Sequence, residues 1–273
     1  MSRVDRELRK RLKFWFGNSF PTTRGQFSYF GTNVYFPVGH ELFRRVCETG
    51  VYEADVLNFM AKHLNDDGLV YDVGANIGLS VLPLIRMKPL LKVVSFEPSP
   101  NSIPYLKRTI AESSYNGRWK LQETAVGEES GATRFCINSN ANGAFDGRGA
   151  TGRAGATDSI EVPLISLDQF WTDSGKPAVC MIKIDVEGFE TEVLRGAARC
   201  LKECRPIVVL EWSLLNLKAL GRKNQELLTI ATELGFEVFA IPSLSSVGTE
   251  ASLELQMKYT ESFVLYPQPT GVR

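Results

Sequence analysis

The sequence lacks several features that would assign it to particular protein classes. No apolar run approaches the ~20 residues that a membrane-spanning helix requires. Lys plus Arg total 31 and Asp plus Glu also total 31, so positive charge is not in excess. A nucleic-acid binder with a wholly basic surface is therefore not indicated. What remains is a composition ordinary for a soluble globular protein, whose 273 residues suffice for one large domain or two small ones.

Cysteine is scarce, and its spacing argues against disulfides and zinc. The five cysteines are an odd number and stand at Cys47, Cys136, Cys180, Cys200 and Cys204. Cys200 and Cys204 lie four residues apart on an expected helix, and no second pair at zinc spacing accompanies them. We therefore expect reduced thiols in a cytoplasmic protein.

The first residues, "MSRVDRELRKRLKFWF", lack the apolar core of a signal peptide, which agrees with a cytoplasmic location. Val4, Leu8, Leu12 and Trp15 fall on one helical stripe among basic residues. Such a helix could lie on an anionic membrane surface, or it could pack its apolar stripe on the domain. We favour packing on the domain and keep peripheral membrane contact as the alternative.

From residue 51 onward, segments with strand and helix patterns alternate. Strands are expected at 69–74, 92–97, 119–126, 179–186, 206–212, 236–242 and 262–267, with helices at 51–64, 79–87, 103–111, 190–201 and 225–234. This alternation predicts a mostly parallel sheet covered by helices on both faces. We expect residues 1–50 to form a helical or irregular extension to a domain of residues 51–273.

One long segment interrupts this alternation. Residues 138–159 are rich in Gly, Ala, Asn and Ser and stand between "TRFCIN" and "IEVPLISL", which have the pattern of a hairpin. We interpret the segment as a flexible insertion held near the carboxyl edge of the sheet, where it either closes over a substrate or remains a passive surface loop. Its candidate contacts are Phe145, Arg148 and Arg153.

Acidic residues gather where the expected parallel strands end. Asp72, Glu97, Asp185, Glu187 and Glu211 all stand at or just past such ends. Ligands of open α/β sheets bind at the carboxyl edge, and acids placed there are costly unless a ligand or a partner compensates them. The sequence therefore predicts a binding site at this edge.

The loop "YDVGANIGLS" after the first strand has the pattern of a nucleotide-type cofactor site. Gly74 allows a tight turn, Gly78 allows close approach of a ligand, and free amides at the helix start favour a carboxylate or phosphate. Glu97, at the end of the next strand, can accept hydrogen bonds from the two hydroxyls of a ribose. NAD and S-adenosylmethionine both fit this unit.

Other motifs decide between the two cofactors. The loop is not G-x-G-x-x-G, no Tyr is followed four residues later by Lys, and no G-x-x-x-x-G-K-[ST] occurs. The final segments "FEVFAIP" and "SFVLYP", without a helical pattern between them, suit a terminal antiparallel hairpin. That ending is typical of class I methyltransferases, so S-adenosylmethionine is favoured.

At this point the chain resembles the FkbM-type methyltransferases. The resemblance runs from about Tyr52 to Leu210 through "YDVGANIG", "VVSFEPSPNSIPYLKRTI", "TAVGEESG", "EVPLISLDQF" and "IKIDVEGFETEVLRGA". It implies a class I, Rossmann-like α/β fold with a mostly parallel seven-stranded sheet, and methyl transfer from S-adenosylmethionine to a hydroxyl of a sugar or secondary metabolite. It implies cofactor-binding roles for Asp72, Gly74, Ala75, Asn76, Gly78, Glu97, Pro98, Thr124, Ala125 and Asp185.

The chemistry of methyl transfer suggests roles for the acids. Asp185 could hold the ammonium group of the cofactor or polarise the acceptor hydroxyl, and Glu187 could do the same or begin the next helix. Glu211 could be a further acid over the same pocket. His40, in "VGHE", could reach the pocket as a base. Asp185, Glu187 and Glu211 could instead hold Mg²⁺, which we do not favour because no metal-like spacing fixes a third carboxylate.

Two other functions stay open. Lys183, Asp185 and Glu211 resemble the lysine and acid groups of RNA 2′-hydroxyl methyltransferases, although the balanced charge does not favour RNA. The chain could also be a non-catalytic domain that binds the cofactor and a partner. The signature [ND]-P-P-[YF] of amino-methyltransferases is absent, so nitrogen acceptors are less favoured. The sequence identifies neither the acceptor nor the oligomeric state.

Overall fold

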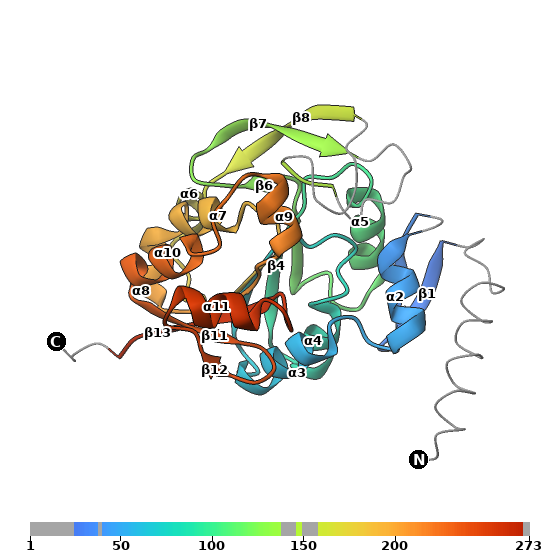
Figure 1. The fold of residues 1–273 in the computed structure, drawn as a ribbon. Helices are drawn as coiled ribbons and strands as arrows, with labels where there is room; N and C mark the ends of the chain where they lie inside the picture. The colour runs from blue at the N-terminus through green and yellow to red at the C-terminus, as the bar shows by residue number, and fades with distance from the viewer. Residues whose placement is uncertain (1–24, 38–39, 138–145, 149–157, 270–273) are drawn as a thin grey trace, which may run out of the picture.

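The fold is a large mixed sheet with helices on both faces (Figure 1). The computed structural model describes residues 25–37, 40–137, 146–148 and 158–269. The strands of the large sheet are β3 (Leu69–Val73), β4 (Lys92–Phe96), β5 (Trp119–Gln122), β9 (Met181–Ile184), β10 (Ile207–Glu211), β11 (Phe236–Ala240), β12 (Ser245–Ser246) and β13 (Ser262–Pro267). Their spatial order is β12-β11-β13-β10-β9-β3-β4-β5. No described helix is both long enough and apolar enough to span a bilayer.

This sheet is that of a class I methyltransferase. Strands β5, β4, β3, β9 and β10 are parallel, and β13 is antiparallel to both β10 and β11. Two expectations need correction. The sheet has eight strands instead of seven, because the two-residue β12 extends its edge. A helix, α11 (Glu250–Gln256), separates β11 from β13, although the sequence between them shows no helical pattern that we recognised.

Alternating residues of the central strands build two cores. Val70, Met181 and Val209 face one core, and Tyr71, Ile182 and Val208 face the other. The first core is covered by α2 (Glu41–Thr49), α3 (Ala54–His63), α4 (Leu82–Met87) and α5 (Ile103–Glu112). The second is covered by α6 (Leu167–Asp173), α7 (Glu190–Arg195), α8 (Ala198–Cys204), α9 (Leu214–Ala219), α10 (Glu226–Leu234) and α11. Burial on both faces explains the apolar runs of these strands.

A smaller sheet lies across the carboxyl edge of the large one (Figure 1). It contains β6 (Ala125–Val126), β8 (Asp158–Ile165) and β7 (Gly131–Ile137), with β7 and β8 antiparallel as expected. The segment 119–126, expected as one strand, is divided: β5 ends at Gln122, and β6 pairs with β8. Of the predicted insertion, residues 138–145 and 149–157, including Phe145 and Arg153, lie outside the described residues.

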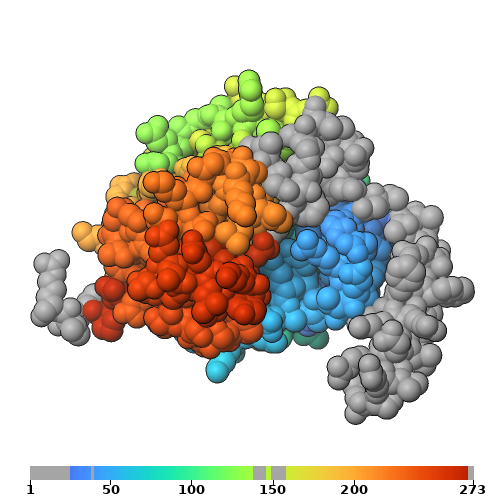
Figure 2. Space-filling view, viewed as in Figure 1, coloured from blue at the N-terminus to red at the C-terminus, as the bar shows by residue number. Residues whose placement is uncertain are grey.

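The described part of the N-terminal extension shares the first core. Strands β1 (Gln26–Tyr29) and β2 (Thr32–Tyr35) form a hairpin, and the amide of Tyr35 donates to Thr109 Oγ1 of α5 at 3.1 Å. Figure 2 shows this blue segment adjoining the orange and red C-terminal part of the surface. The predicted amphipathic stripe of residues 4–15 lies outside the described residues.

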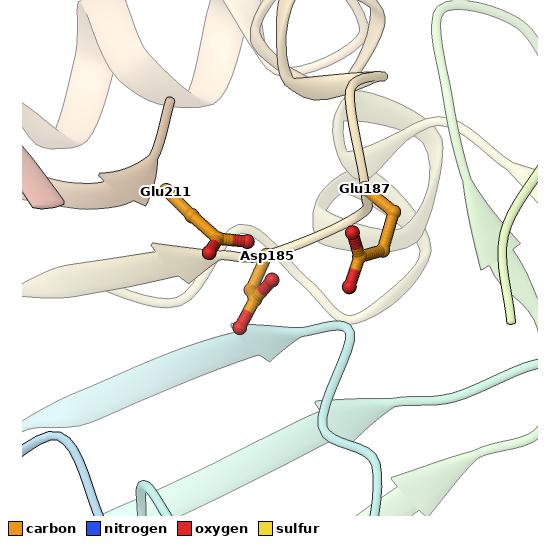
Figure 3. Close-up of side chains that lie close together, drawn as sticks. All are labelled: Asp185, Glu187 and Glu211. Atoms are coloured by element: carbon orange, nitrogen blue, oxygen red, sulfur yellow. The ribbon is translucent and has the colours of Figure 1, made fainter. Parts of the chain in front are cut away.

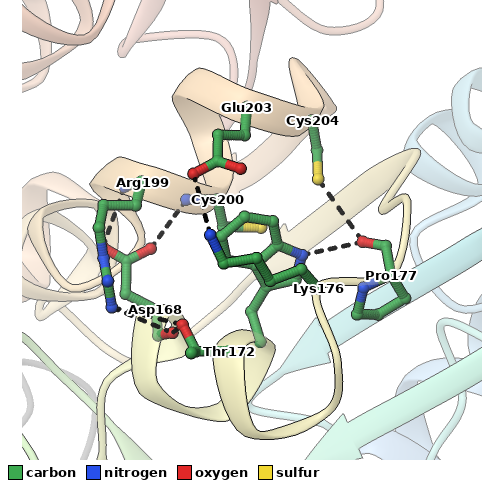
Figure 4. Close-up of polar contacts among 9 residues, drawn as sticks. Asp168, Thr172, Lys176, Pro177, Arg199, Cys200, Glu203 and Cys204 are labelled. Atoms are coloured by element: carbon green, nitrogen blue, oxygen red, sulfur yellow. Dashed lines mark hydrogen bonds and ion pairs between the residues drawn. The ribbon is translucent and has the colours of Figure 1, made fainter.

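Polar contacts join helices α6 and α8 (Figure 4). The cysteines among them form no disulfide bond. The carboxylate of Asp168 accepts hydrogen bonds from the amides of Arg199 and Cys200, at 2.9 and 2.8 Å, and so caps the first turn of α8. Cys204 Sγ lies 3.6 Å from the carbonyl oxygen of Pro177. All five cysteines are free thiols, as the odd number and spacing suggest.

Candidate active site

A row of buried polar side chains crosses three adjacent strands near the carboxyl edge of the sheet. Ser95 of β4, Asp72 of β3 and Lys183 of β9 are neighbours in the strand register. Ser95 Oγ donates to Asp72 Oδ2 at 3.0 Å, and Trp119 Nε1 donates to Ser95 Oγ at 2.9 Å. Burial raises the pKa of Asp72 to about 6, although Lys183 and Ser95 oppose the change. Asp72 is fully buried, so we infer that it stabilises this edge of the sheet and does not contact a ligand.

Lys183 is the cation at the centre of this edge. Its Nζ donates to Asp185 Oδ2 at 3.0 Å and lies 3.9 Å from Glu53 Oε2. Burial alone would lower the pKa of Lys183, but Asp185, Glu53 and Asp72 together raise it well above its ordinary value. Lys183 therefore remains a cation and cannot serve as a base at neutral pH. A single lysine within an otherwise apolar strand was the sequence signal for such a buried ion pair.

Two residues ahead of α3 complete the surroundings of Lys183. Glu53 has a left-handed backbone (φ +43°) and begins α3, while the adjacent Tyr52 is buried. Burial raises the pKa of Glu53, and Lys183 opposes the rise. Burial also raises the pKa of Tyr52, with Glu53, Asp185 and Glu211 adding to it. No sequence pattern indicates these contacts, because they depend on how α3 packs against the sheet.

Three carboxylates converge beside Lys183 (Figure 3). Asp185 follows β9, Glu187 lies in the loop before α7, and Glu211 is the last residue of β10. Each offers an oxygen within 4.8 Å of the others. This juxtaposition places a third carboxylate beside Asp185 and Glu187, although no spacing in the sequence indicates one. Sequence spacing could not reveal it, because Glu211 comes from a different strand.

The loop that carries Asp185 and Glu187 is held from two sides. Glu187 has a left-handed backbone (φ +55°), and Asn216 Nδ2 of α9 donates to its Oε2 at 2.6 Å. The amides of Val186 and Gly188 donate to Glu190 Oε1 at 3.3 and 3.0 Å. Burial raises the pKa of Glu190 to about 8, against the effect of these amides. Glu190 and Asn216 were not singled out from the sequence, and both fix the position of Glu187.

Gly74, which the sequence assigns to a tight turn, has a second role in the glycine loop. A Cβ atom on Gly74 (φ +81°) would lie 1.7 Å from the carbonyl oxygen of Asp185, so the two loops can meet only at a glycine. The amides of Gly74 and Ala75 donate to the carbonyl oxygen of Phe96 at 3.0 and 3.1 Å. The amides of Gly74 and Ala75 are therefore not available to a ligand, and α4 begins only at Leu82.

Gly78 also differs from its expected role. A Cβ atom there would lie 2.7 Å from the ring of Trp119 and 2.9 Å from Leu106. The glycine thus allows close packing within the core, and it does not line the cavity described below. Packing of β5 against the first core therefore explains this glycine more directly than ligand binding does.

Glu97 stands at the end of β4 with both carboxylate oxygens oriented by backbone amides. Asn76 N donates to Oε2 at 2.7 Å, and Ser99 N donates to Oε1 at 2.8 Å. Burial raises the pKa of Glu97 to about 7, although these two amides oppose the change. Nearby, Asp146 accepts hydrogen bonds from Ser99 Oγ and Asn101 Nδ2 at 2.6 and 3.0 Å, which ties the insertion to this end of the site.

One cavity, about 860 Å³ including its open mouth, joins Glu97 to the acids. The residues predicted from the sequence that line it are Gly74, Ala75, Asn76, Glu97, Pro98, Thr124, Ala125, Arg148, Asp185 and Glu187. Among the described lining residues, Asp72, Gly78, His40 and Glu211 are missing.

The structure does not favour His40 as a base of the site. Its side chain is only 1% exposed, and it does not line the described part of the cavity. Burial lowers the pKa of His40 to about 4, although hydrogen bonding with Asn76 and the charge of Glu41 oppose the change. His40 is neutral and enclosed within the described part of the chain, so it is a weaker candidate for the base than Asp185.

The lining fits S-adenosylmethionine in its donor set. A buried carboxylate with oriented oxygens, Glu97, suits ribose hydroxyls, and Asp185 offers negative charge to the cationic part of the molecule. Asp185, Glu187 and Glu211 could also hold a divalent cation through oxygen ligands. Lys183 already neutralises part of the charge of Asp185, which weakens that alternative.

Comparisons with known proteins agree with this geometry. The Methyltransferase FkbM domain matches residues 72–238. Hexuronic acid methyltransferase AglP of Haloferax volcanii is 26% identical over 160 residues, covering 58% of this chain and 61% of that protein. Methyltransferase sdnD of Sordaria araneosa is 29% identical over 178 residues, covering 55% of this chain and 68% of that protein. The chain thus spans less than two thirds of the length of AglP.

A crystal structure of methyltransferase FkbM from Methylobacillus flagellatus KT superposes with a TM-score of 0.47 at 17% identity, covering 74% of this chain and 44% of that one. The domain match itself extends over more than half of the chain and includes the glycine loop, Glu97 and all three acids. The chain therefore belongs to the FkbM methyltransferase family.

Proposed function

We propose that this enzyme transfers a methyl group from S-adenosylmethionine to a hydroxyl of a sugar or a small metabolite. The observation that carries the proposal is the single cavity that has Glu97 at one end and Asp185 with Glu187 at the other. Such a cavity can accommodate a nucleoside at the first end and an acceptor hydroxyl at the second. The relative named as a hexuronic acid methyltransferase supports a sugar as the acceptor.

In this proposal the chain binds and orients the cofactor, and the cofactor supplies an electrophilic methyl group when bound. Glu97 accepts hydrogen bonds from the ribose hydroxyls, and Thr124 and Ala125 line the adenine end. Gly74 lets the loop before α4 approach Asp185 closely. Holding the reacting atoms in line can contribute up to ~7–11 kcal/mol to the rate.

Asp185 is the residue that we expect to act on the acceptor. Its carboxylate can accept the hydrogen bond of the acceptor hydroxyl and take the proton as the oxygen attacks. Lys183 fixes the carboxylate from one side through the 3.0 Å contact. Glu187 and Glu211 add negative charge where the acceptor oxygen loses its proton. An RNA acceptor is less well supported, because the net charge of the chain is zero.

The proposal is tested by a labelled-methyl assay. Purified enzyme and labelled S-adenosylmethionine are incubated with cell extract separated into glycans, lipids, small metabolites and RNA. Label is expected in glycans or small metabolites. Label only in RNA, with activity that collapses as salt rises, would favour 2′-hydroxyl methylation instead. Cofactor binding without label in any fraction would favour a non-catalytic role.

Replacing Glu97 with Ala is expected to weaken binding of S-adenosylhomocysteine about tenfold or more. Charge-assisted hydrogen bonds contribute roughly 1.5–3 kcal/mol each, and the variant removes the carboxylate that would make them. Calorimetric titration measures the change, and exposed Glu123→Ala serves as a control. Equal affinity of Glu97→Ala and the wild type would reject the ribose assignment.

Cofactor binding is also expected to depend on pH through Glu97. Its pKa is about 7 in the free protein, whereas ribose hydroxyls that donate to it favour the ionised form. Binding therefore releases a proton below pH 7, and affinity should rise with pH up to about 7 and then level off. Titrations from pH 5.5 to 8.5 should show this rise in the wild type and not in Glu97→Gln. Parallel pH profiles would assign the effect to another group.

Removal of divalent metal is expected to leave turnover unchanged. Lys183 contacts Asp185, and Asn216 contacts Glu187, so two of the three acids already have compensating partners. Turnover is measured before and after dialysis against a chelator. A loss that Mg²⁺ restores would assign Asp185, Glu187 and Glu211 as metal ligands.

A further inference from the structure

Arg148 lines the cavity without a carboxylate partner. It belongs to the short described part of the insertion and is half-buried. Its Nε donates to Thr133 Oγ1 at 3.3 Å, and its guanidinium lies 4.8 Å from the ring centroid of Phe189. Among the described residues no carboxylate lies within ion-pair distance of it, and the buried Nη1 has no hydrogen-bond partner.

A second arginine provides a direct comparison. Arg222 lies 4.9 Å from the centroid of the same Phe189 ring, but it forms ion pairs with Glu192 and Glu226 and does not line the cavity. Two guanidinium groups thus contact one aromatic ring. The one outside the cavity has acidic partners, and the one in its wall has none in the part of the chain that the structure describes.

The absence of a side chain at Gly127 leaves space for the guanidinium group of Arg148. A Cβ atom on Gly127 would lie 2.9 Å from Nη1, so a larger residue there would displace the guanidinium. Burial lowers the pKa of Arg148, and Arg222 lowers it further, while Glu192 opposes them. A partly desolvated cation is costly when nothing neutralises it, and an anionic ligand would remove that cost.

The position of Arg148 relative to the acids limits what that ligand can be. Phe189, which it contacts, is two residues beyond Glu187. Asp185 and Glu187 would repel an anion placed over them but accept a hydroxyl. An acceptor that satisfies both parts of the cavity therefore carries a hydroxyl near Asp185 and an anionic group near Arg148.

We propose that Arg148 binds an anionic group of the methyl acceptor, a carboxylate or a phosphate, so that the acceptor is a sugar acid or a phosphorylated sugar. The guanidinium presents its donors in a planar fork that matches the oxygens of either group. This inference rests on the proposed methyl transfer and specifies its substrate class. Arg148 acts on binding of the acceptor, whereas Asp185 acts on its hydroxyl.

The test uses the full chain and an unfractionated pool of water-soluble metabolites and glycans passed over an anion exchanger. Retained and unretained material is assayed separately with labelled S-adenosylmethionine, using wild type, Arg148→Gln, Arg148→Lys and the matched control Arg222→Gln. Binding of S-adenosylhomocysteine is measured for each variant to confirm a folded cofactor site. Retained material is also treated with phosphatase, or its carboxylates are blocked as amides, to distinguish the two anionic groups.

We expect acceptor activity in the retained material. Arg148→Gln should raise the KM for it about tenfold to a hundredfold with cofactor affinity unchanged, Arg148→Lys should lie between, and Arg222→Gln should stay near wild type. Activity only in unretained material, or an equal loss in Arg148→Gln and Arg222→Gln, would overturn the inference and leave methyl transfer intact. Weaker cofactor binding by Arg148→Gln would overturn it too, by making Arg148 a cofactor contact. Absence of label from all material would reject methyl transfer, and the inference with it.

Discussion

Asp185→Asn is expected to lower the single-turnover rate by about 10²–10⁴-fold while the fold and cofactor binding persist. The amide keeps the shape of the carboxylate but can neither take the acceptor proton nor offer negative charge to the reacting centre. Lys183 would lose its closest carboxylate, at 3.0 Å, yet Glu53 stays within 3.9 Å of it. Rapid mixing of acceptor with the enzyme and labelled cofactor measures the rate.

The control for this variant is Asp173→Asn, which changes an exposed acid of α6 far from the cavity lining. Its rate should equal that of the wild type. If Asp185→Asn also reacted at the wild-type rate, Asp185 would be a structural partner of Lys183, and Glu211→Gln would be the next variant to measure. A variant of His40 would not be the next one to measure, because His40 does not line the described cavity.

Lys183→Met is expected to lower the free energy of unfolding by about 3–5 kcal/mol, because it breaks a buried ion pair by removing one partner. Asp185, Glu53 and Asp72 all depend on this single ammonium group. Lys183 itself is only 4% exposed, so solvent cannot replace it. Urea unfolding at pH 7.5, compared at the transition midpoint, gives the difference if the slope is unchanged.

Lys120→Met is the matched control, since Lys120 is an exposed lysine on β5 of the same sheet and should change stability by no more than about 0.5 kcal/mol. The loss of unfolding free energy caused by Lys183→Met should become smaller as the pH falls. The acids that have lost their cationic partner can then bind protons and become neutral. A Lys183→Met variant as stable as the wild type at pH 7.5 would show that the acids compensate one another without the lysine.

Sequence patterns predicted the fold well where they were local. Buried parallel strands such as β3, β9 and β10 have continuous apolar runs, and the helices between them have clear periodicity. The division of 119–126 between two sheets was not predictable, because both parts have strand composition and only tertiary pairing separates them. Helix α11 was missed because its seven residues bury only Leu253, which leaves little periodic signal.

For the site, sequence order identified the residues at the strand ends but not their partners. Glu97 and Asp185 follow strands whose carboxyl ends meet at one edge, so their shared cavity was predictable. The contacts of Glu53 with Lys183 and of Asn216 with Glu187 join segments 130 and 29 residues apart through helix packing. Gly74 was expected to allow a tight turn, and its φ of +81° agrees with one, but the sequence did not indicate that it also lets the Asp185 backbone approach.

The position of β13 has a consequence for how the protein is made. This last strand lies between β10 and β11, so the edge of β10 stays unpaired until residues 262–267 have been synthesised. Glu211, at the end of β10, pairs in register with Ser262, the first residue of β13. A nascent chain that already contains every acid of the site therefore still exposes an open strand edge beside one of them, a recognised hazard for aggregation. The edge that carries Glu211 is completed only after residues 262–267 have been translated, by a segment that contributes no side chain to the cavity lining described above.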